Sequence, residues 1–142
     1  GSFMKILVIN GPNLNMLGLR EPEIYGTQTL DEINAYIESS FEGINFEFFQ
    51  SNCEGEIISK IHESQFDEFD GAVINPGAYS HYSYAIYDAI KSVKTPFVEV
   101  HLSDIASRQE EWRKVSVTAP ASKIMISGKR IMGYIEAVKY FL

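Results

Sequence analysis

Cysteine is scarce in this sequence, since Cys53 is the only one among 142 residues. A single thiol cannot form an internal disulfide, so a reducing cytoplasm is the expected setting. No apolar run approaches the roughly 18 residues that a membrane span needs, and we expect no signal peptide before Met4. Residues 1–3, Gly-Ser-Phe, look like a cloning scar, and we expect a single domain over residues 4–142.

Positive charge is also in short supply. The chain has 12 Lys and Arg against 19 Asp and Glu, which gives a net charge of −7. This balance argues against nucleic acid and against anionic membranes as partners. An acidic protein can still bind an acidic small molecule where a few arginines are concentrated, so the charge excludes partners without identifying one.

The common signatures of cofactor, metal and covalent chemistry are missing as well. The sequence has no G-x-G-x-x-G fingerprint, no Walker-type loop and no G-x-S-x-G elbow. It has no H-E-x-x-H motif and no Cys and His at zinc-ligand spacing. We expect Cys53 to be a buried, inert thiol and His62 to be a solvated or structural side chain.

Short β-rich runs alternate with helical patterns along the chain. The runs that favour strands are residues 5–10, 44–50, 71–75, 97–101 and 124–127. Four of them are nearly continuous in apolar residues, as strands covered on both faces should be, whereas 44–50 alternates and suits a sheet edge.

Between these runs, apolar residues recur at helix spacing, and Thr29 is placed to cap the first helix. The recurring residues are Leu30, Ile33, Ile37 and Phe41, then Ile57, Ile58 and Ile61, then Ile86, Ala89, Ile90 and Val93, and finally Ile131, Ile135 and Val138. Strands alternating with helices predict an α/β fold with a doubly wound parallel sheet. Five strands favour the flavodoxin-like order 2-1-3-4-5.

Ligands of such sheets bind beyond the carboxyl ends of the strands, where the strand order reverses. Those ends are polar here. The first strand runs into N-G-P-N-L-N at 10–15, the third into N-P-G-A-Y-S-H at 75–81, and the fourth ends in E-V-H-L-S at 99–103. We therefore expect a crevice lined by Asn, His and Ser side chains.

A charged loop from Gly18 to Gly26 follows the first predicted strand. It is either a solvated connection or a lid that carries Arg20 and Tyr25 over the crevice. A free phenol titrates near pH 10, so Tyr25 would be a base at neutral pH only where a cation favours the phenolate. Arg20 is close enough in sequence to supply that cation, and the flanking glycines favour a mobile lid.

Glu99 and His101 lie two residues apart on a predicted strand, so both side chains project from the same face. A carboxylate beside an imidazole fixes the orientation of the ring and favours its protonated form, which is an acid. The alternative is a buried polar pair with a purely structural role.

Taken together, these segments resemble the type II 3-dehydroquinate dehydratases over essentially the whole chain from Met4. The three strand-end motifs occur in the family's order together with R-E-P-E-I-Y-G at 20–26 and S-N-x-E-G-E at 51–56. The resemblance implies a flavodoxin-like fold over a single catalytic domain, and a lyase of the shikimate pathway that needs neither a metal nor an organic cofactor. It also implies a homododecamer built from four trimers. The pathway served is either biosynthetic, toward chorismate and the aromatic amino acids, or catabolic, from quinate.

The resemblance also implies roles for individual residues. Tyr25 would remove a proton from the carbon next to the substrate ketone, and Arg20 would favour its tyrosinate. Asn13 would help to stabilise the enolate. His101 would protonate the departing hydroxyl, with Glu99 tuning it. No lysine is placed to form a Schiff base, in agreement with the type II route.

Six further positions would bind the substrate, namely Asn75, His81, Leu102, Ser103, Arg113 and Asp88. The first two would hydrogen-bond the ring hydroxyls, and the next three would hold the carboxylate, for which the planar fork of arginine is suited. Asp88 would reach the site of a neighbouring subunit.

Some positions depart from the family's pattern. Asp104 stands where asparagine is common, and it would weaken substrate binding by repulsion if it pointed inward. Arg108 competes with Arg113 for the carboxylate, Tyr87 replaces a frequent arginine at the subunit contact, and Cys53 replaces a common histidine. Two other functions stay open: a non-catalytic flavodoxin-like binding module, and a dehydratase of another small hydroxy acid.

Overall fold

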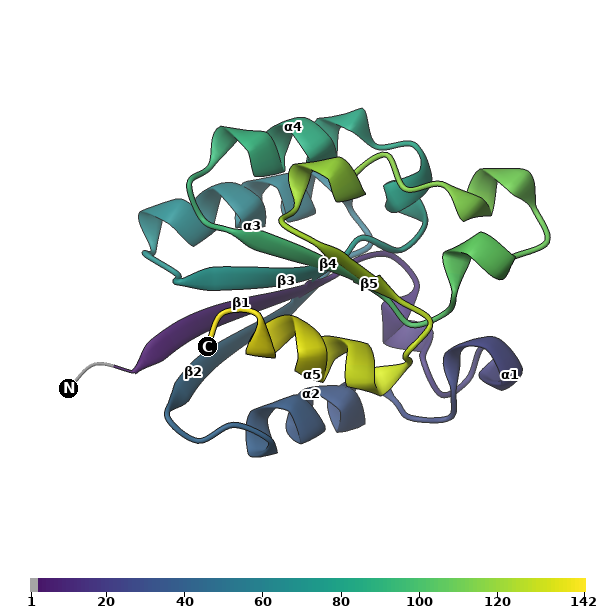
Figure 1. Ribbon diagram of the computed structural model, residues 1–142, viewed down its shortest axis with the longest axis horizontal. Helices are drawn as coiled ribbons and strands as arrows, with labels where there is room; N and C mark the ends of the chain where they lie inside the picture. The colour runs from purple at the N-terminus through teal and green to yellow at the C-terminus, as the bar shows by residue number, and fades with distance from the viewer. Residues whose placement is uncertain (1–2) are drawn as a thin grey trace.

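The computed structural model describes residues 3–142, and at its centre lies a parallel sheet of five strands in the order β2-β1-β3-β4-β5 (Figure 1). The strands are β1 (Met4–Asn10), β2 (Ile44–Gln50), β3 (Gly71–Asn75), β4 (Phe97–His101) and β5 (Met125–Ser127). The predicted flavodoxin-like order is confirmed. Two boundaries differ, because β1 begins at Met4 rather than at residue 5 and β5 at Met125 rather than at residue 124.

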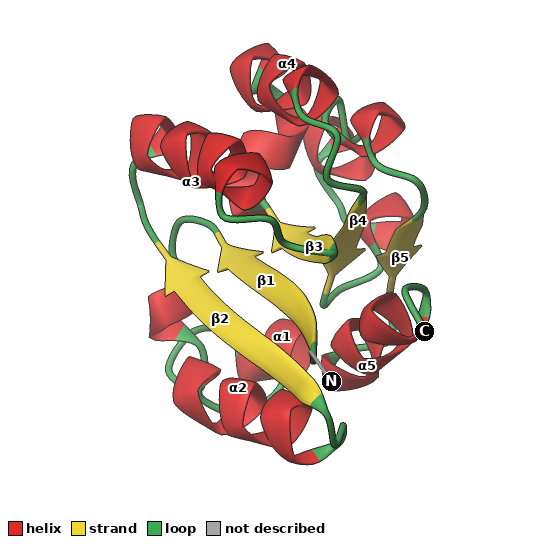
Figure 2. Cartoon of the chain, turned by 90° about the vertical axis from the view of Figure 1, so that its left-hand side faces the viewer, coloured by secondary structure: helices red, strands yellow, loops and turns green. Residues whose placement is uncertain are grey.

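Helices cover both faces of the sheet, as Figure 2 shows. α2 (Leu30–Ser39) and α5 (Ile131–Lys139) lie on one face, and α3 (Glu54–Phe66) and α4 (Tyr84–Ser92) lie on the other. Alternate residues of β1 serve the two cores: Ile6 and Val8 pack with α2 and α5, and Leu7 and Ile9 pack with α3 and α4. The continuous apolar character of this strand follows from burial on both sides.

Local features bear out several sequence predictions and overturn one. Thr29 caps α2 in a capping box, in which its hydroxyl accepts from the Glu32 amide and the Glu32 carboxylate accepts from the Thr29 amide. β2 lies at the edge of the sheet with an alternating burial pattern, and His62 is exposed. The expectation of a buried Cys53 is wrong, because this residue is the exposed N-cap of α3.

The carboxyl ends of β1 and β3 are held together by a close backbone contact. The Gly11 amide donates to the Asn75 carbonyl at 2.8 Å. A Cβ atom on Gly11 would lie 2.5 Å from the carbonyl oxygen of Pro76, so only glycine fits between these loops.

Within the described part of the chain, no helix is long and apolar enough to span a membrane.

Candidate active site

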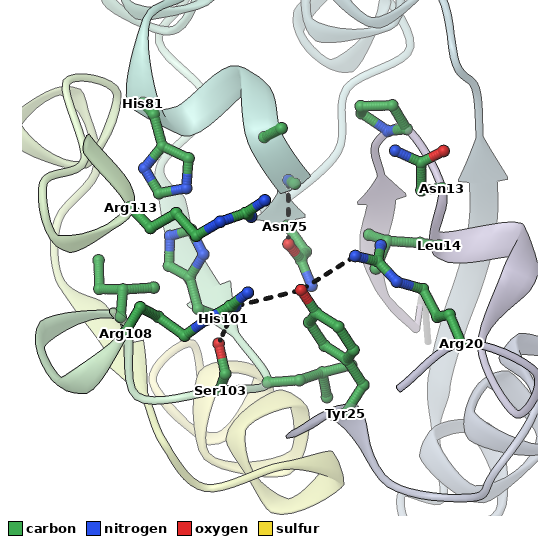
Figure 3. Close-up of a pocket in the computed structure, with 15 residues that line it drawn as sticks. Asn13, Leu14, Arg20, Tyr25, Asn75, His81, His101, Ser103, Arg108 and Arg113 are labelled. Atoms are coloured by element: carbon green, nitrogen blue, oxygen red, sulfur yellow. Dashed lines mark hydrogen bonds between the residues drawn. The ribbon is translucent and has the colours of Figure 1, made fainter. Parts of the chain in front are cut away.

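A cavity lies beyond the carboxyl ends of β1, β3 and β4 and contains most of the residues singled out from the sequence (Figure 3). Those that line it are Asn13, Arg20, Tyr25, Asn75, His81, His101, Leu102, Ser103, Arg108 and Arg113. Glu99 is fully buried and touches His101 without lining the cavity, and Asp88 is exposed on α4 away from it. Among residues 3–142, no group of three or more His, Cys, Asp and Glu side chains is arranged to hold a metal ion.

Tyr25 ends the short helix α1 (Pro22–Tyr25), which begins with a proline and stops at Gly26, where φ is 92°. Its phenol oxygen accepts hydrogen bonds from Arg20 Nη2 at 3.0 Å and from Arg108 Nη1 at 3.1 Å. Two guanidinium groups on one oxygen stabilise negative charge there. Arg20 was predicted to contact the phenol. The contact from Arg108 was missed, because its position in an irregular segment far along the chain carries no periodic signal.

His101 is held by Glu99, as the spacing along β4 predicted. Its Nε2 atom lies 2.7 Å from a Glu99 carboxylate oxygen, and both residues are buried. This contact leaves Nδ1 as the ring nitrogen available to a ligand in the cavity. The Glu99 carboxylate also accepts from the hydroxyls of Ser116 and Thr118, each at 2.5 Å, and no pattern in the sequence indicates either of these contacts.

His81 also lines the cavity, where a backbone carbonyl holds its ring. Its Nδ1 atom lies 2.7 Å from the Val115 carbonyl, which can only accept, so Nδ1 carries the proton and Nε2 is an acceptor in the neutral ring. Burial lowers the pKa of His81, and the Val115 carbonyl opposes this effect. The nearby positive charges of His101, Arg113 and Arg108 lower the pKa further. A ring that stays neutral can accept a hydrogen bond from a ligand hydroxyl.

Asn75 is fixed by groups that the sequence analysis did not identify. Its amide oxygen accepts from the Gly77 amide at 3.1 Å, and its amide nitrogen donates to the Tyr134 hydroxyl at 3.1 Å. That hydroxyl in turn donates to Asn10 at 2.5 Å, and full burial raises the pKa of Tyr134, so it remains a donor. The Asn75 amide keeps one N–H for a ligand. In the sequence, Tyr134 is indistinguishable from an apolar residue of the last helix.

The two candidate arginines occupy different positions. Arg108 Nη1 bonds both the Tyr25 phenol and Ser103 Oγ, the latter at 3.2 Å. Arg113 Nε lies 3.2 Å from the Glu110 carboxylate, and the side chain lines the cavity without touching the phenol. Asp104, whose charge could have repelled a substrate carboxylate, does not line this cavity. Its carboxylate accepts from the Ala106 amide at 3.1 Å.

Comparisons with known proteins converge on one family. A sequence profile described as dehydroquinase class II matches residues 4–142. The 3-dehydroquinate dehydratase of Clostridium perfringens is 56% identical over 137 residues, covering 95% of this chain and 94% of the relative. The protein of the same name from Clostridium botulinum is 58% identical over 139 residues, covering 96% and 93%. The crystal structure of a type II dehydroquinase from Butyrivibrio crossotus superposes with a TM-score of 0.92 at 51% identity, covering 99% of each chain.

Proposed function

The chain belongs to the class II dehydroquinase family, and from this premise we propose that Tyr25 and His101 act as base and acid in removing water from 3-dehydroquinate. Family membership makes the chain an enzyme with 3-dehydroquinate dehydratase activity, a hydro-lyase. One observation carries the assignment of roles: a phenol that accepts from two guanidinium groups and a histidine paired with a buried carboxylate line the same cavity.

The first step is proton removal from the carbon next to the substrate ketone. Tyr25, as tyrosinate, takes this proton, and the electron pair moves onto the ketone oxygen to give an enolate. Arg20 and Arg108 stabilise the tyrosinate by donating to its oxygen. Asn13, which also lines the cavity, supplies a polar group for the developing enolate charge.

The second step is loss of the hydroxyl beta to the ketone. Protonated His101 donates from Nδ1 to this hydroxyl, which leaves as water while the enolate collapses to the conjugated ketone. The Glu99 carboxylate accepts the hydrogen bond from Nε2 and so balances the charge of the imidazolium. A base and an acid that approach from opposite faces of the ring give an anti elimination.

The remaining predicted residues bind the substrate in this proposal. The His81 Nε2 atom and the free N–H of Asn75 pair with ring hydroxyls. Arg113, with the backbone of Leu102 and Ser103, holds the carboxylate. Arg108 is engaged by the phenol, which supports Arg113 rather than Arg108 for this role.

The position of Asp104 supports 3-dehydroquinate as the substrate. A different hydroxy acid was considered because Asp104 could repel a carboxylate from the binding corner. Asp104 does not line the cavity and its carboxylate accepts from the Ala106 amide, which argues against this repulsion. The dehydratase activity of the family also sets aside the non-catalytic binding module.

We further propose a homo-oligomer, with a dodecamer as the expected form. Asp88 on α4 is exposed outside its own cavity, near exposed Tyr82 and Tyr84, which suits contact with a neighbouring subunit. Light scattering on the purified protein measures the mass of the assembly, and a monomeric mass would contradict this proposal.

The lone thiol of Cys53 supports a cytoplasmic location, where the product would enter the shikimate pathway toward chorismate.

The direct test follows the ultraviolet absorbance of 3-dehydroshikimate after the enzyme is mixed with 3-dehydroquinate. We expect turnover by the wild type and near-total loss in Tyr25→Phe, which keeps the ring and removes only the phenol oxygen. Tyr36→Phe, an exposed tyrosine of α2, is the matched control and should keep full activity. An active, folded Tyr25→Phe variant would show that another group is the base.

A further inference from the structure

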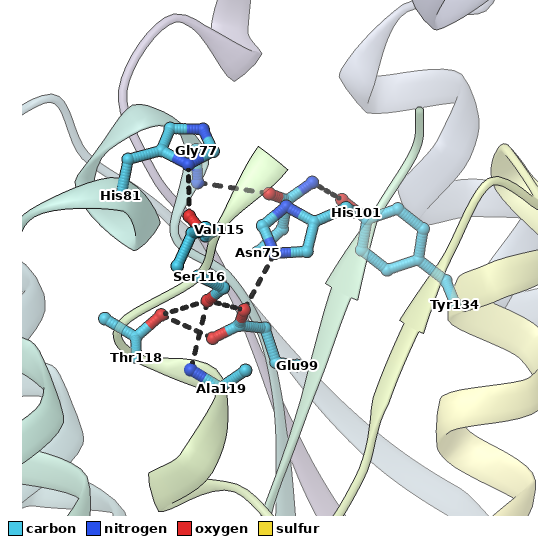
Figure 4. A network of polar contacts seen from close by, with 10 residues as sticks. All are labelled: Asn75, Gly77, His81, Glu99, His101, Val115, Ser116, Thr118, Ala119 and Tyr134. Atoms are coloured by element: carbon cyan, nitrogen blue, oxygen red, sulfur yellow. Dashed lines mark hydrogen bonds and ion pairs between the residues drawn. The ribbon is translucent and has the colours of Figure 1, made fainter. Parts of the chain in front are cut away.

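One short stretch of chain, residues 115–118, contacts His81 directly and reaches His101 through Glu99 (Figure 4). The Val115 carbonyl accepts from His81 Nδ1 at 2.7 Å. The hydroxyls of Ser116 and Thr118 bond the two oxygens of Glu99, which in turn bonds His101. The stretch is itself anchored to the site, because the Val117 amide donates to the Ser80 carbonyl at 2.6 Å, next to His81.

The direction of these hydrogen bonds can be worked out from the partners. Ser116 Oγ accepts from the Ala119 amide at 3.0 Å, so its own proton is free to point at Glu99 Oε2. The single proton of Thr118 Oγ1 points at Glu99 Oε1. With His101 Nε2, the carboxylate is approached by three donors, an arrangement that suits an acceptor without a proton of its own.

Because Glu99 is buried, losing any of these hydrogen bonds would leave its carboxylate without a replacement partner. Its side chain has no solvent exposure, so water cannot replace a missing hydrogen bond. A buried carboxylate without partners is costly and responds by binding a proton or by changing orientation. Either response alters His101, because the same carboxylate fixes which ring nitrogen faces the cavity and how tightly the imidazolium holds its proton.

We propose that Ser116 and Thr118 are positioning residues for the reaction, which hold Glu99 ionised and oriented so that His101 presents Nδ1 to the leaving hydroxyl. The inference rests on the proposed role of His101 as the acid. Because Val115 belongs to the same stretch, residues 115–118 set the tautomer of both histidines at once, His81 through a backbone carbonyl and His101 through Glu99.

The test is Thr118→Val, which keeps the shape and removes the hydroxyl, with Thr118→Ser as the rescue that restores a donor. Hydrogen bonds to charged groups are worth enough that kcat should fall roughly tenfold to a hundredfold in Thr118→Val, with KM unchanged. Without this donor, the Glu99–His101 pair holds its first proton more tightly, so the high-pH limb of the kcat profile should move to higher pH. Thr95→Val, another buried threonine outside the cavity, is the control and should change neither quantity.

A purely structural role predicts a different pattern. In that case Thr118→Val would lower the unfolding temperature while kcat per folded enzyme and the pH profile stay at wild-type values, and this result would overturn the proposal. Ser116→Ala, at a half-buried side chain, provides the same comparison should the valine variant fold poorly. We expect it to shift the same limb in the same direction.

A readout without turnover separates this inference from the proposed function. Nitrogen NMR of isotope-labelled histidine follows the chain's three histidines directly. We expect one fixed tautomer of His101 in the wild type and a mixture of tautomers in the Ser116→Ala, Thr118→Val double variant. An unchanged tautomer in the folded double variant contradicts the positioning role, whereas a silent wild type in the absorbance assay contradicts the proposed function instead.

Discussion

Replacing Arg108 with methionine removes one of the two guanidinium groups that donate to the Tyr25 phenol and keeps most of the side-chain stem. The Arg108 guanidinium carbon lies 5.5 Å from the centre of the Tyr25 ring, and Arg20 retains its own contact at 4.1 Å. A unit charge about 5 Å from a phenolate contributes about 3 kcal/mol at an effective dielectric constant near 20. Tyr25 is only half-buried, so solvent screens roughly half of this and leaves about 1.5 kcal/mol.

That free energy predicts a kcat about tenfold lower in Arg108→Met than in the wild type. The reaction needs the tyrosinate, so the low-pH limb of the kcat profile should also move to higher pH. Initial rates of 3-dehydroshikimate formation measured across pH give both quantities. Arg108→Lys keeps the charge but loses the planar fork, and it should fall between the two enzymes.

The matched control is Arg130→Met. Arg130 also reaches the helix of Tyr25, where its Nη2 atom donates to the Glu23 carbonyl at 3.2 Å, but it does not bond the phenol. This control should keep the wild-type kcat and pH profile. Equal losses in both variants would mean that lid order, rather than charge on the phenol oxygen, controls the rate. A wild-type pH profile in Arg108→Met would refute the assigned role of Arg108.

Three further predictions concern stability. Gly11→Ala should lower the unfolding free energy in urea by at least about 2 kcal/mol, because the new methyl group would lie 2.5 Å from the Pro76 carbonyl oxygen; a smaller loss would mean that the two loops can separate. Arg130→Gly should raise the unfolding free energy by about 1 kcal/mol, since residue 130 has φ 51° and ψ −137°, a region that favours glycine; lower stability would show that the exposed bond to Glu23 outweighs the strain. The lowered pKa of His81 means that the unfolded chain binds more protons between that value and the ordinary 6.5, so the unfolding free energy should decrease as pH falls through this window. The decrease should be smaller in His81→Gln, and identical slopes in the two proteins would contradict the assignment.

The parts of this molecule that follow a periodic pattern could be predicted from the sequence. The β4 spacing placed Glu99 and His101 together because alternate side chains of a strand share a face, and the Thr29 cap followed from a residue type at a helix start. The contact of Arg108 with Tyr25 could not be predicted in this way. It joins the short helix α1 to an irregular segment 83 residues further along the chain, and no local pattern encodes how such distant segments come together.

The supporting hydroxyls were missed for a related reason. Ser116 and Thr118 look like ordinary loop residues in the sequence, and Tyr134 fits the apolar face of a helix. Each matters only because a polar atom comes to lie beside a buried partner, Glu99 for the first two and Asn75 for the third. Their roles depend on tertiary packing, which the residue types alone do not specify.

The cavity also resolves how a chain with a net charge of −7 can bind a carboxylate and stabilise a tyrosinate. Three of its 12 Lys and Arg residues, Arg20, Arg108 and Arg113, line this one cavity. Glu99, the carboxylate that takes part in the proposed reaction, is fully buried and accepts hydrogen bonds from His101, Ser116 and Thr118. Its negative charge therefore stabilises the imidazolium of His101 and does not face the substrate. Asp104 is bound to a backbone amide outside the cavity. Positive potential at the site therefore arises from where a few charges lie and not from the overall composition, which is why net charge could exclude nucleic acid but not an acidic substrate.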